Sequence, residues 1–134
     1  LSENGLDCRI VPASDPVGEG TYNAAEFTPA LIRHGEKIED SFWTGEQPRA
    51  CFGTGDQGIY MLVIEGRYPD EGIRGTSVNT CSDILLSYGC RNALNMDGGS
   101  SAILWYDGEY VTQSSSSFLR YTGGRPLPNA WVYG

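Results

Sequence analysis

The sequence NMDGGSS, which begins at residue 95, places one carboxylate, two glycines and two hydroxyls between two strand-like segments. The backbone amides of Gly98, Gly99 and Ser100 can form an anion-binding concavity, to which Ser100 and Ser101 add hydroxyl donors. Asp97 can serve there as a nucleophile, as a base for water, or as the stabiliser of an oxocarbenium-like transition state. The competing interpretation is that Asp97 only caps a tight turn, a common role for aspartate.

Three arginines occupy comparable places along the chain. Arg49, Arg67 and Arg125 each lie at the end of a strand-like segment. The planar guanidinium group makes paired, charge-assisted hydrogen bonds to phosphate oxygens, so the three together favour a phosphate clamp. Taken singly, each of them is more simply interpreted as one half of a surface ion pair.

Two further polar residues and three aromatic ones are candidates for the same site. Glu65, in IEGR, is the best second carboxylate because it also lies at a strand end. Asn129 can bond a sugar hydroxyl, or it can close the turn in PLPN. Trp105, Tyr106 and Trp131 alternate with their neighbours, which predicts core packing, with stacking on a sugar ring as the alternative.

The charge balance of the 134-residue chain limits its partners. There are 17 acidic and 9 basic residues, with a formal net charge of −8. This balance argues against nucleic acid or an anionic membrane as the main partner, and it still permits a small anionic ligand. No apolar stretch is long enough to insert across a bilayer. The single histidine, His34, is expected at a hairpin turn. Because the sequence contains no His or Cys cluster, we expect no metal and no cofactor.

Four cysteines, Cys8, Cys51, Cys81 and Cys90, leave the redox compartment open. If Cys81 lies inside a helix, about 13 Å of helix separates it from Cys90, which is beyond disulfide reach. A bond between Cys8 and Cys51 is then the preferred pairing, and free buried thiols are the alternative.

The elements that must position these residues follow from local patterns. PALIRHGEKI predicts a hairpin around His34, and PRACFGTGDQGIYMLVIEGR predicts a second, longer one. Because YMLVIE is apolar almost throughout, we expect it to be a central strand that is covered on both faces. Residues 77–88 are expected to form the main helix, capped by Thr76 or Ser77 at its start and by Gly89 at its end.

The remaining chain predicts more strands. RNALNM follows the helix, SAILWY and EYV are joined by the turn DG, and NAWVY ends the chain. One helix packed on a mixed sheet gives an α+β fold in a single compact domain. Within it we expect residues 1–30 to form a polar arm and residues 31–134 to form the folded α+β part.

The order of these motifs resembles that of the phosphodiester glycosidase family. The matching segments run from RACFGTGDQG through VIEGR and GTSVNTCSDILLSYGCRNALNMDGGSS to AILWYDGEYV and GRPLPNAWVY. The resemblance covers about two-thirds of the chain, from Pro48 to Tyr133. It implies a hydrolase that cleaves the glycosidic bond of a sugar-1-phosphodiester, with a phosphorylated glycan as its partner and an extracellular or cell-surface location. The three arginines and Asn129 match arginine and polar positions of the family pattern.

The chain departs from the family pattern in two places. Family members usually carry DGGGS, whereas here Ser100 follows only two glycines. Family domains also usually contain an earlier NGG-F-like segment, which residues 1–27 lack, so we expect a missing N-terminal segment or a second chain to complete the domain. The missing N-terminal motif and the unclear second carboxylate favour the alternative to an enzyme, a non-catalytic phosphosugar-binding domain of a surface or secreted protein. A structural module is the third interpretation.

Overall fold

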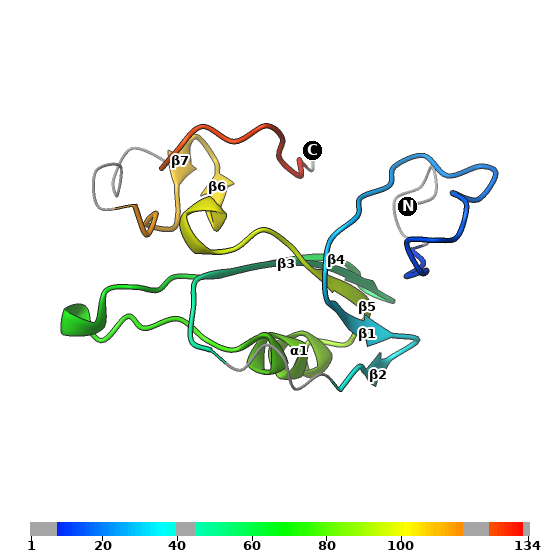
Figure 1. The fold of residues 1–134 in the computed structure, drawn as a ribbon, viewed down its shortest axis with the longest axis horizontal. Helices are drawn as coiled ribbons and strands as arrows, with labels where there is room; N and C mark the ends of the chain where they lie inside the picture. Colours follow the sequence, from blue (N-terminus) through cyan, green and yellow to red (C-terminus); the bar gives the residue numbers. More distant parts are fainter. Residues whose placement is uncertain (1–7, 40–44, 117–123, 133–134) are drawn as a thin grey trace.

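The computed structural model describes residues 8–39, 45–116 and 124–132. Its core is a five-stranded sheet in the order β2-β1-β5-β3-β4, with α1 packed against one face (Figure 1). The strands are β1 (Ala30–Arg33), β2 (Glu36–Lys37), β3 (Arg49–Gly55), β4 (Gly58–Ile64), β5 (Cys90–Asn95), β6 (Trp105–Tyr106) and β7 (Glu109–Tyr110). The helices are α1 (Val78–Ser87) and two single 3-10 turns, η1 (Pro69–Glu71) and η2 (Gly99–Ser101). The predicted α+β class is confirmed, and every pairing between the described strands is antiparallel, where a mixed sheet had been expected.

The predicted hairpins are present. His34 and Gly35 form the turn between β1 and β2, with His34 at φ 55° and exposed to solvent. β3 and β4 pair along their whole length, and β6 and β7 meet at a turn that contains Asp107 and Gly108. The predicted strand over residues 101–106 forms only from Trp105 onward, because the chain first makes the turn η2.

The helix also matches its prediction closely. Ser77 is its N-cap, and its side chain accepts a hydrogen bond from the amide of Thr80 at 3.1 Å. The chain leaves α1 through Gly89 at φ 83°, as the capping pattern required. The apolar face of α1 packs on the sheet in one core cluster, whose buried members are Leu31, Ile32, Cys51, Val78, Cys81, Leu85, Cys90 and Ala93.

The position predicted for YMLVIE within the sheet is wrong. This strand is β4, which lies at the edge of the five-stranded sheet, and most of its residues are only partly buried. One face of this apolar strand packs against the core, and the other face is only partly covered. Tyr60, Leu62 and Ile64 pack against the core under α1. Met61 belongs to the opposite face, where it pairs with Phe52 and is 36% exposed.

The C-terminal segment covers part of that opposite face. The rings of Phe52 and Trp131 stack with centroids 4.4 Å apart and an interplanar angle of 17°. Figure 1 shows this segment, the hairpin β6–β7 and the N-terminal segment all on the side of the sheet away from α1. The predicted packing of Trp131 is therefore confirmed. The strand predicted over residues 129–133 is absent from the part that is described, which ends at Val132.

The other two aromatic predictions are wrong. Trp105 and Tyr106 are 60% and 71% exposed, because they belong to a short two-stranded hairpin and not to the main sheet. Within the described residues, no helix has the length and apolar character needed to cross a membrane.

Candidate functional site

The loop that carries Asp97 is fixed to the beginning of β3 by backbone hydrogen bonds. The amide of Met96 donates to the carbonyl of Ala50 at 2.8 Å, and the amide of Gly99 donates to the carbonyl of Pro48 at 2.9 Å. A Cβ atom on Gly98 would lie 2.6 Å from the Pro48 oxygen, which is far inside van der Waals contact. Only glycine at residue 98 therefore lets this loop lie so close to the neighbouring chain.

The loop then closes into the 3-10 turn η2. The amide of Ser101 donates to the carbonyl of Gly98 at 3.0 Å, and the amide of Ala102 donates to that of Gly99 at 3.2 Å. Since the Gly99 amide is directed to Pro48, it holds the loop in place instead of facing a ligand. The loop can still present the hydroxyl of Ser101 and the carboxylate of Asp97.

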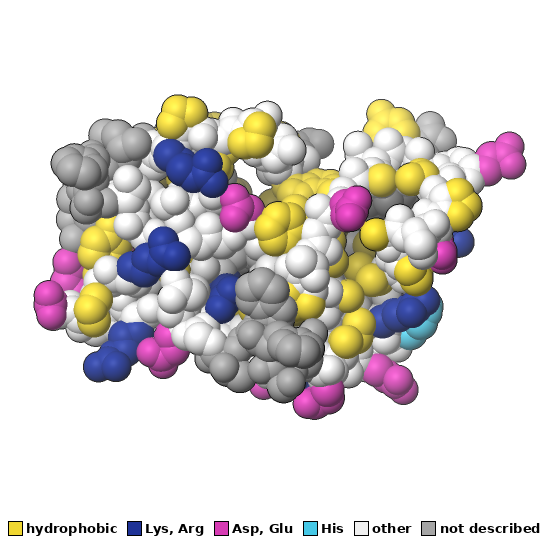
Figure 2. Space-filling model, in the orientation of Figure 1, with side chains coloured by type: hydrophobic (Ala, Val, Ile, Leu, Met, Phe, Trp, Pro, Cys, Tyr) yellow, Lys and Arg dark blue, Asp and Glu magenta, His cyan; other side chains and the backbone are white. Residues whose placement is uncertain are grey.

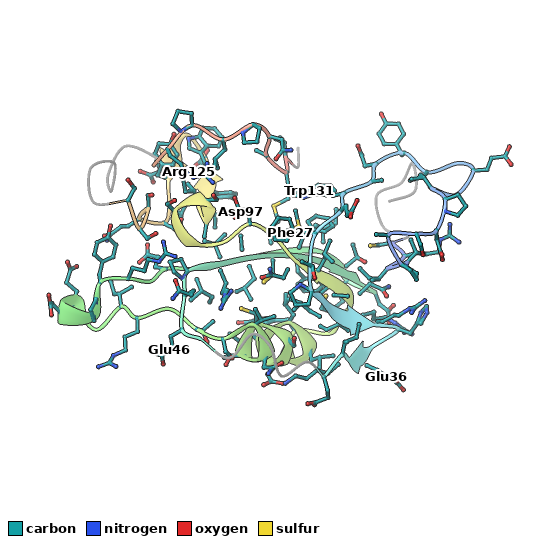
Figure 3. All side chains as sticks on the ribbon, viewed as in Figure 1. Phe27, Glu36, Glu46, Asp97, Arg125 and Trp131 are labelled. Atoms are coloured by element: carbon teal, nitrogen blue, oxygen red, sulfur yellow. The ribbon has the colours of Figure 1, made fainter. Side chains whose placement is uncertain are left out.

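Arg125 joins two side chains of this loop. Its Nη2 atom donates to Oδ2 of Asp97 at 3.1 Å and also to the hydroxyl of Ser101. Figure 3 shows Arg125 and Asp97 directed toward one another above the sheet. The two side chains are 46% and 59% exposed, and ion pairs this accessible stabilise a fold by only about 0–1 kcal/mol. The pair is thus better suited to meeting a ligand than to holding the protein together.

Arg67 approaches the same loop from another part of the chain. Both of its Nη atoms lie 3.1 Å from the position that a Cβ on Gly99 would occupy. Its Nε atom donates to Oε1 of Gln47 at 2.9 Å, which fixes the direction of the guanidinium. Arg67 has φ 68°, a conformation that costs a non-glycine residue about 1–3 kcal/mol and that is found disproportionately at functional sites.

Arg49 has a different environment. It is only 7% exposed, and its guanidinium donates to the carbonyls of Thr76 at 3.0 Å and Gly45 at 2.7 Å. Its side chain also influences the two thiols of Cys51 and Cys81, which belong to the core under α1. Arg49 therefore anchors the beginning of β3 beside the helix, while Arg67 and Arg125 contact the loop.

Glu65 and Asn129 belong to other segments of the chain than the loop that carries Asp97. Oε1 of Glu65 accepts a hydrogen bond from the amide of Gln113 at 2.6 Å, so Glu65 orders the polar segment that follows β7. The hydroxyl of Tyr68 donates to the carbonyl of Ser114 at 2.5 Å and holds the same segment. Asn129 is exposed on the C-terminal segment, four residues beyond Arg125.

Sequence reasoning missed the backbone and side-chain groups that support the loop. Gln47 orients Arg67, and the carbonyl of Pro48 receives the Gly99 amide. Tyr68 and Ser114 hold the neighbouring segment. A sequence signal existed only for Gln47 and Pro48, which directly precede the first matching motif. Backbone carbonyls leave no mark on residue type, so the other contacts had none.

The charges on the surface are mixed. Figure 2 shows basic side chains gathered mainly at the end of the molecule that carries η1 and the hairpin β6–β7, with acidic side chains among them. Within residues 8–39, 45–116 and 124–132, no group of three or more His, Cys, Asp or Glu side chains is arranged to hold a metal ion.

Comparison with known proteins identifies a family whose sequence pattern includes this loop. A sequence model of the phosphodiester glycosidase family matches residues 4–133. The chain belongs to the phosphodiester glycosidase family. The match begins well before Pro48, so the expected limit to the C-terminal two-thirds was too narrow. The segment before the sheet also belongs to the phosphodiester glycosidase pattern.

A solved structure has a similar fold. It is the crystal structure of a hypothetical protein from Synechocystis, with 28% identity and a TM-score of 0.54. The alignment covers 66% of this chain and 18% of that one, so this chain corresponds to a small part of the Synechocystis protein. No curated protein matches the chain.

Proposed function

We propose that this protein is a hydrolase that cleaves the glycosidic bond of a sugar-1-phosphodiester, with Asp97 at the reacting centre. The observation that carries the proposal is that two arginines from separate parts of the chain meet at the loop that bears Asp97: Arg125 bonds to Asp97, and Arg67 occupies the space that a side chain on Gly99 would fill. Membership of the phosphodiester glycosidase family supports this reaction class. The substrate would be a phosphorylated glycan outside the cell or at its surface.

The charge change in this reaction explains the two arginines. A phosphodiester carries one negative charge, and breaking the bond between the anomeric carbon and oxygen leaves a phosphomonoester that carries more. Guanidinium groups placed where this charge develops stabilise the transition state more than the ground state. Arg67 lies against Gly99 with both Nη atoms on the loop side, so we assign it to the phosphate.

Asp97 acts on the sugar in this proposal. Arg125 orients its carboxylate through Oδ2, and the carboxylate stabilises the positive charge at the anomeric carbon or traps the sugar covalently. A phosphomonoester is a good leaving group and needs little help from a general acid. The engagement of Glu65 with Gln113 is compatible with such a reaction, because Glu65 then supports the fold next to the site.

The proposal is tested by the substitution Asp97→Asn. Asparagine keeps the shape of the side chain and removes its charge, so we expect hydrolysis of sugar-1-phosphodiesters to fall at least about a hundredfold. The full gene-encoded chain should be used, because this chain covers only 18% of the similar Synechocystis chain. Asp56→Asn is the matched control, since Asp56 also forms an exposed ion pair, with Arg91 at 3.4 Å. A wild-type rate in Asp97→Asn would contradict the mechanism.

A second candidate is a phosphosugar-binding domain without catalysis. The position of Glu65 favours it, because the expected second carboxylate is bound to the backbone of Gln113. Saturable binding of a sugar-1-phosphodiester with no turnover by the full-length chain would support this candidate. Turnover that depends on Asp97 would exclude it.

A further inference from the structure

Two of the four cysteines lie together in the core. Cys51 is on β3 and Cys81 is on α1, and their exposed fractions are 4% and 0%. Both belong to the cluster that packs the helix on the sheet. Cys51 is directed to the helix side of the sheet, because its paired neighbour on β4, Leu62, packs against that same cluster.

The two thiols interact with each other across the contact between β3 and α1. This interaction, together with burial, raises the pKa of Cys51 far above its ordinary value, while the same interaction lowers the pKa of Cys81. The guanidinium of Arg49 favours the thiolate at both positions. A thiolate is the nucleophile in disulfide chemistry, so the nearby guanidinium favours the reactive form of either cysteine.

We propose that Cys51 and Cys81 form a disulfide bond that links β3 to α1 when the protein folds in an oxidising compartment. The two side chains lie in the same core cluster between β3 and α1, and all four cysteines are free thiols in the structure. Cys51 therefore has Cys81 as its partner, and not Cys8 as the sequence had suggested. The bond depends on the packing of α1 on β3 and does not rest on the proposed enzymatic function.

The chemistry requires an external disulfide oxidant, such as oxidised glutathione. One cysteine thiolate attacks the oxidant, forms a mixed disulfide and releases one reduced thiol. The second cysteine then attacks the mixed disulfide, forms the Cys51–Cys81 bond and releases the other thiol. Two protons and two electrons leave the protein, and the oxidant is reduced to two thiols.

Burial determines when the exchange occurs. In the folded protein neither sulfur is accessible to a bulky oxidant, since both residues are almost fully buried. The bond therefore forms as α1 docks on β3, before this packing closes over the two sulfurs. Afterwards the same packing shields it from reductants, so this is a structural link and not a switch.

Cys90 provides an internal comparison. It is also buried in the same cluster, at 2% exposure, but its thiol donates to the carbonyls of Thr54 at 3.4 Å and Asn92 at 3.3 Å. Burial alone therefore does not distinguish Cys51 and Cys81 from Cys90. What distinguishes them is that their thiols interact with each other.

The direct test is to map the bonds in full-length protein. Reduced, unfolded protein is refolded with a mixture of reduced and oxidised glutathione, blocked with an alkylating reagent in denaturant, digested and examined by mass spectrometry. Trypsin cuts after Arg49, Arg67, Arg74 and Arg91, so it leaves Cys81 and Cys90 in one peptide. Chymotrypsin cuts after Tyr88 and separates them.

We expect a peptide pair joined through Cys51 and Cys81, and we expect it to persist in Cys90→Ala. Full alkylation of both cysteines, or a bond from Cys51 to Cys8 or Cys90, would overturn the proposal. A second readout is the melting temperature of the wild type in its oxidised and fully reduced forms. We expect reduction to lower it by on the order of 10 °C. In the Cys51→Ala/Cys81→Ala double variant, reduction should not lower the melting temperature in this way. A fall equal to that of the wild type would also overturn the proposal.

Discussion

Arg125 binds the carboxylate of Asp97 from 28 positions further along the chain, with Nη2 3.1 Å from Oδ2. The same nitrogen contacts the hydroxyl of Ser101, so one guanidinium fixes both ends of the DGGSS loop. The C-terminal segment that carries Arg125 is held on the sheet by the stacking of Trp131 on Phe52. The site is thus assembled from parts of the chain that meet only in the folded protein.

Arg125→Ala should separate function from stability. Because the ion pair is exposed, we expect the free energy of unfolding to change by less than about 1 kcal/mol in urea denaturation. The rate of sugar-1-phosphodiester hydrolysis should fall about tenfold or more, because Asp97 loses the charge-assisted hydrogen bond that orients it. Arg91→Ala removes a similarly exposed pair with Asp56 and should leave the rate unchanged. Equal effects of both variants on the rate would contradict the role of Arg125.

Gly98→Ala should disturb the loop through steric contact. The added Cβ would lie 2.6 Å from the carbonyl oxygen of Pro48, so the loop and β3 must move apart. We expect a loss of about 1–3 kcal/mol in the free energy of unfolding, together with loss of ligand binding. Gly45→Ala is the control, because nothing lies within 4 Å of its added Cβ. Normal binding by Gly98→Ala would mean that the loop position does not matter.

Phe52→Ala should be far more destabilising than Trp105→Ala. Phe52 is 7% exposed and carries the stacked Trp131, so we expect truncation to cost about 3–5 kcal/mol in chemical denaturation. Trp105 is 60% exposed, and its truncation should change stability by less than about 0.5 kcal/mol. A large loss of stability in Trp105→Ala would show that the hairpin β6–β7 has a buried role.

Cys90 predicts a specific dependence of stability on pH in the reduced protein. Burial raises its pKa from 9.0 to about 11. Below pH 9 the thiol is protonated in both the folded and unfolded states, and above pH 9 the unfolded state loses its proton first. The contribution to stability is therefore complete below pH 9 and is lost as the pH rises toward 11.

The measurement is the difference in unfolding free energy between wild type and Cys90→Ala, taken from pH 8 to pH 11. Taking the difference cancels the contributions of the other titratable groups, which both proteins share. The stability advantage of the wild type should shrink as the pH rises. A difference that is constant across this range would contradict the raised pKa.

Much of the fold was predictable because its signals are local. The helix is specified by Ser77, Gly89 and the apolar spacing between them, and the hairpins by their glycine-containing turns. The edge position of β4 was not predictable, since an apolar strand has the same sequence at the centre of a sheet as at an edge covered on both faces. The order of strands depends on contacts between β3 and β5, which are far apart along the chain.

The candidate site was predictable to a similar extent. The glycines and Asp97 mark the loop, and Arg67 follows the end of β4 by three residues, whereas Arg125 adjoins no strand within the described residues. The direction of Arg49 follows from the alternation along β3, which places it two residues from Cys51 on the same side of the strand. The hydrogen bond from the backbone amide of Gln113 to Glu65 could not be predicted from either residue type, so only the structure reveals it.

The most direct test of the central claim is hydrolysis of a sugar-1-phosphodiester in water enriched in ¹⁸O. If Asp97 acts at the anomeric carbon, the heavy oxygen will be incorporated into the released sugar, and the phosphomonoester will retain its original oxygens. Label in the phosphate group would mean that the bond to phosphorus is broken, and it would contradict the account.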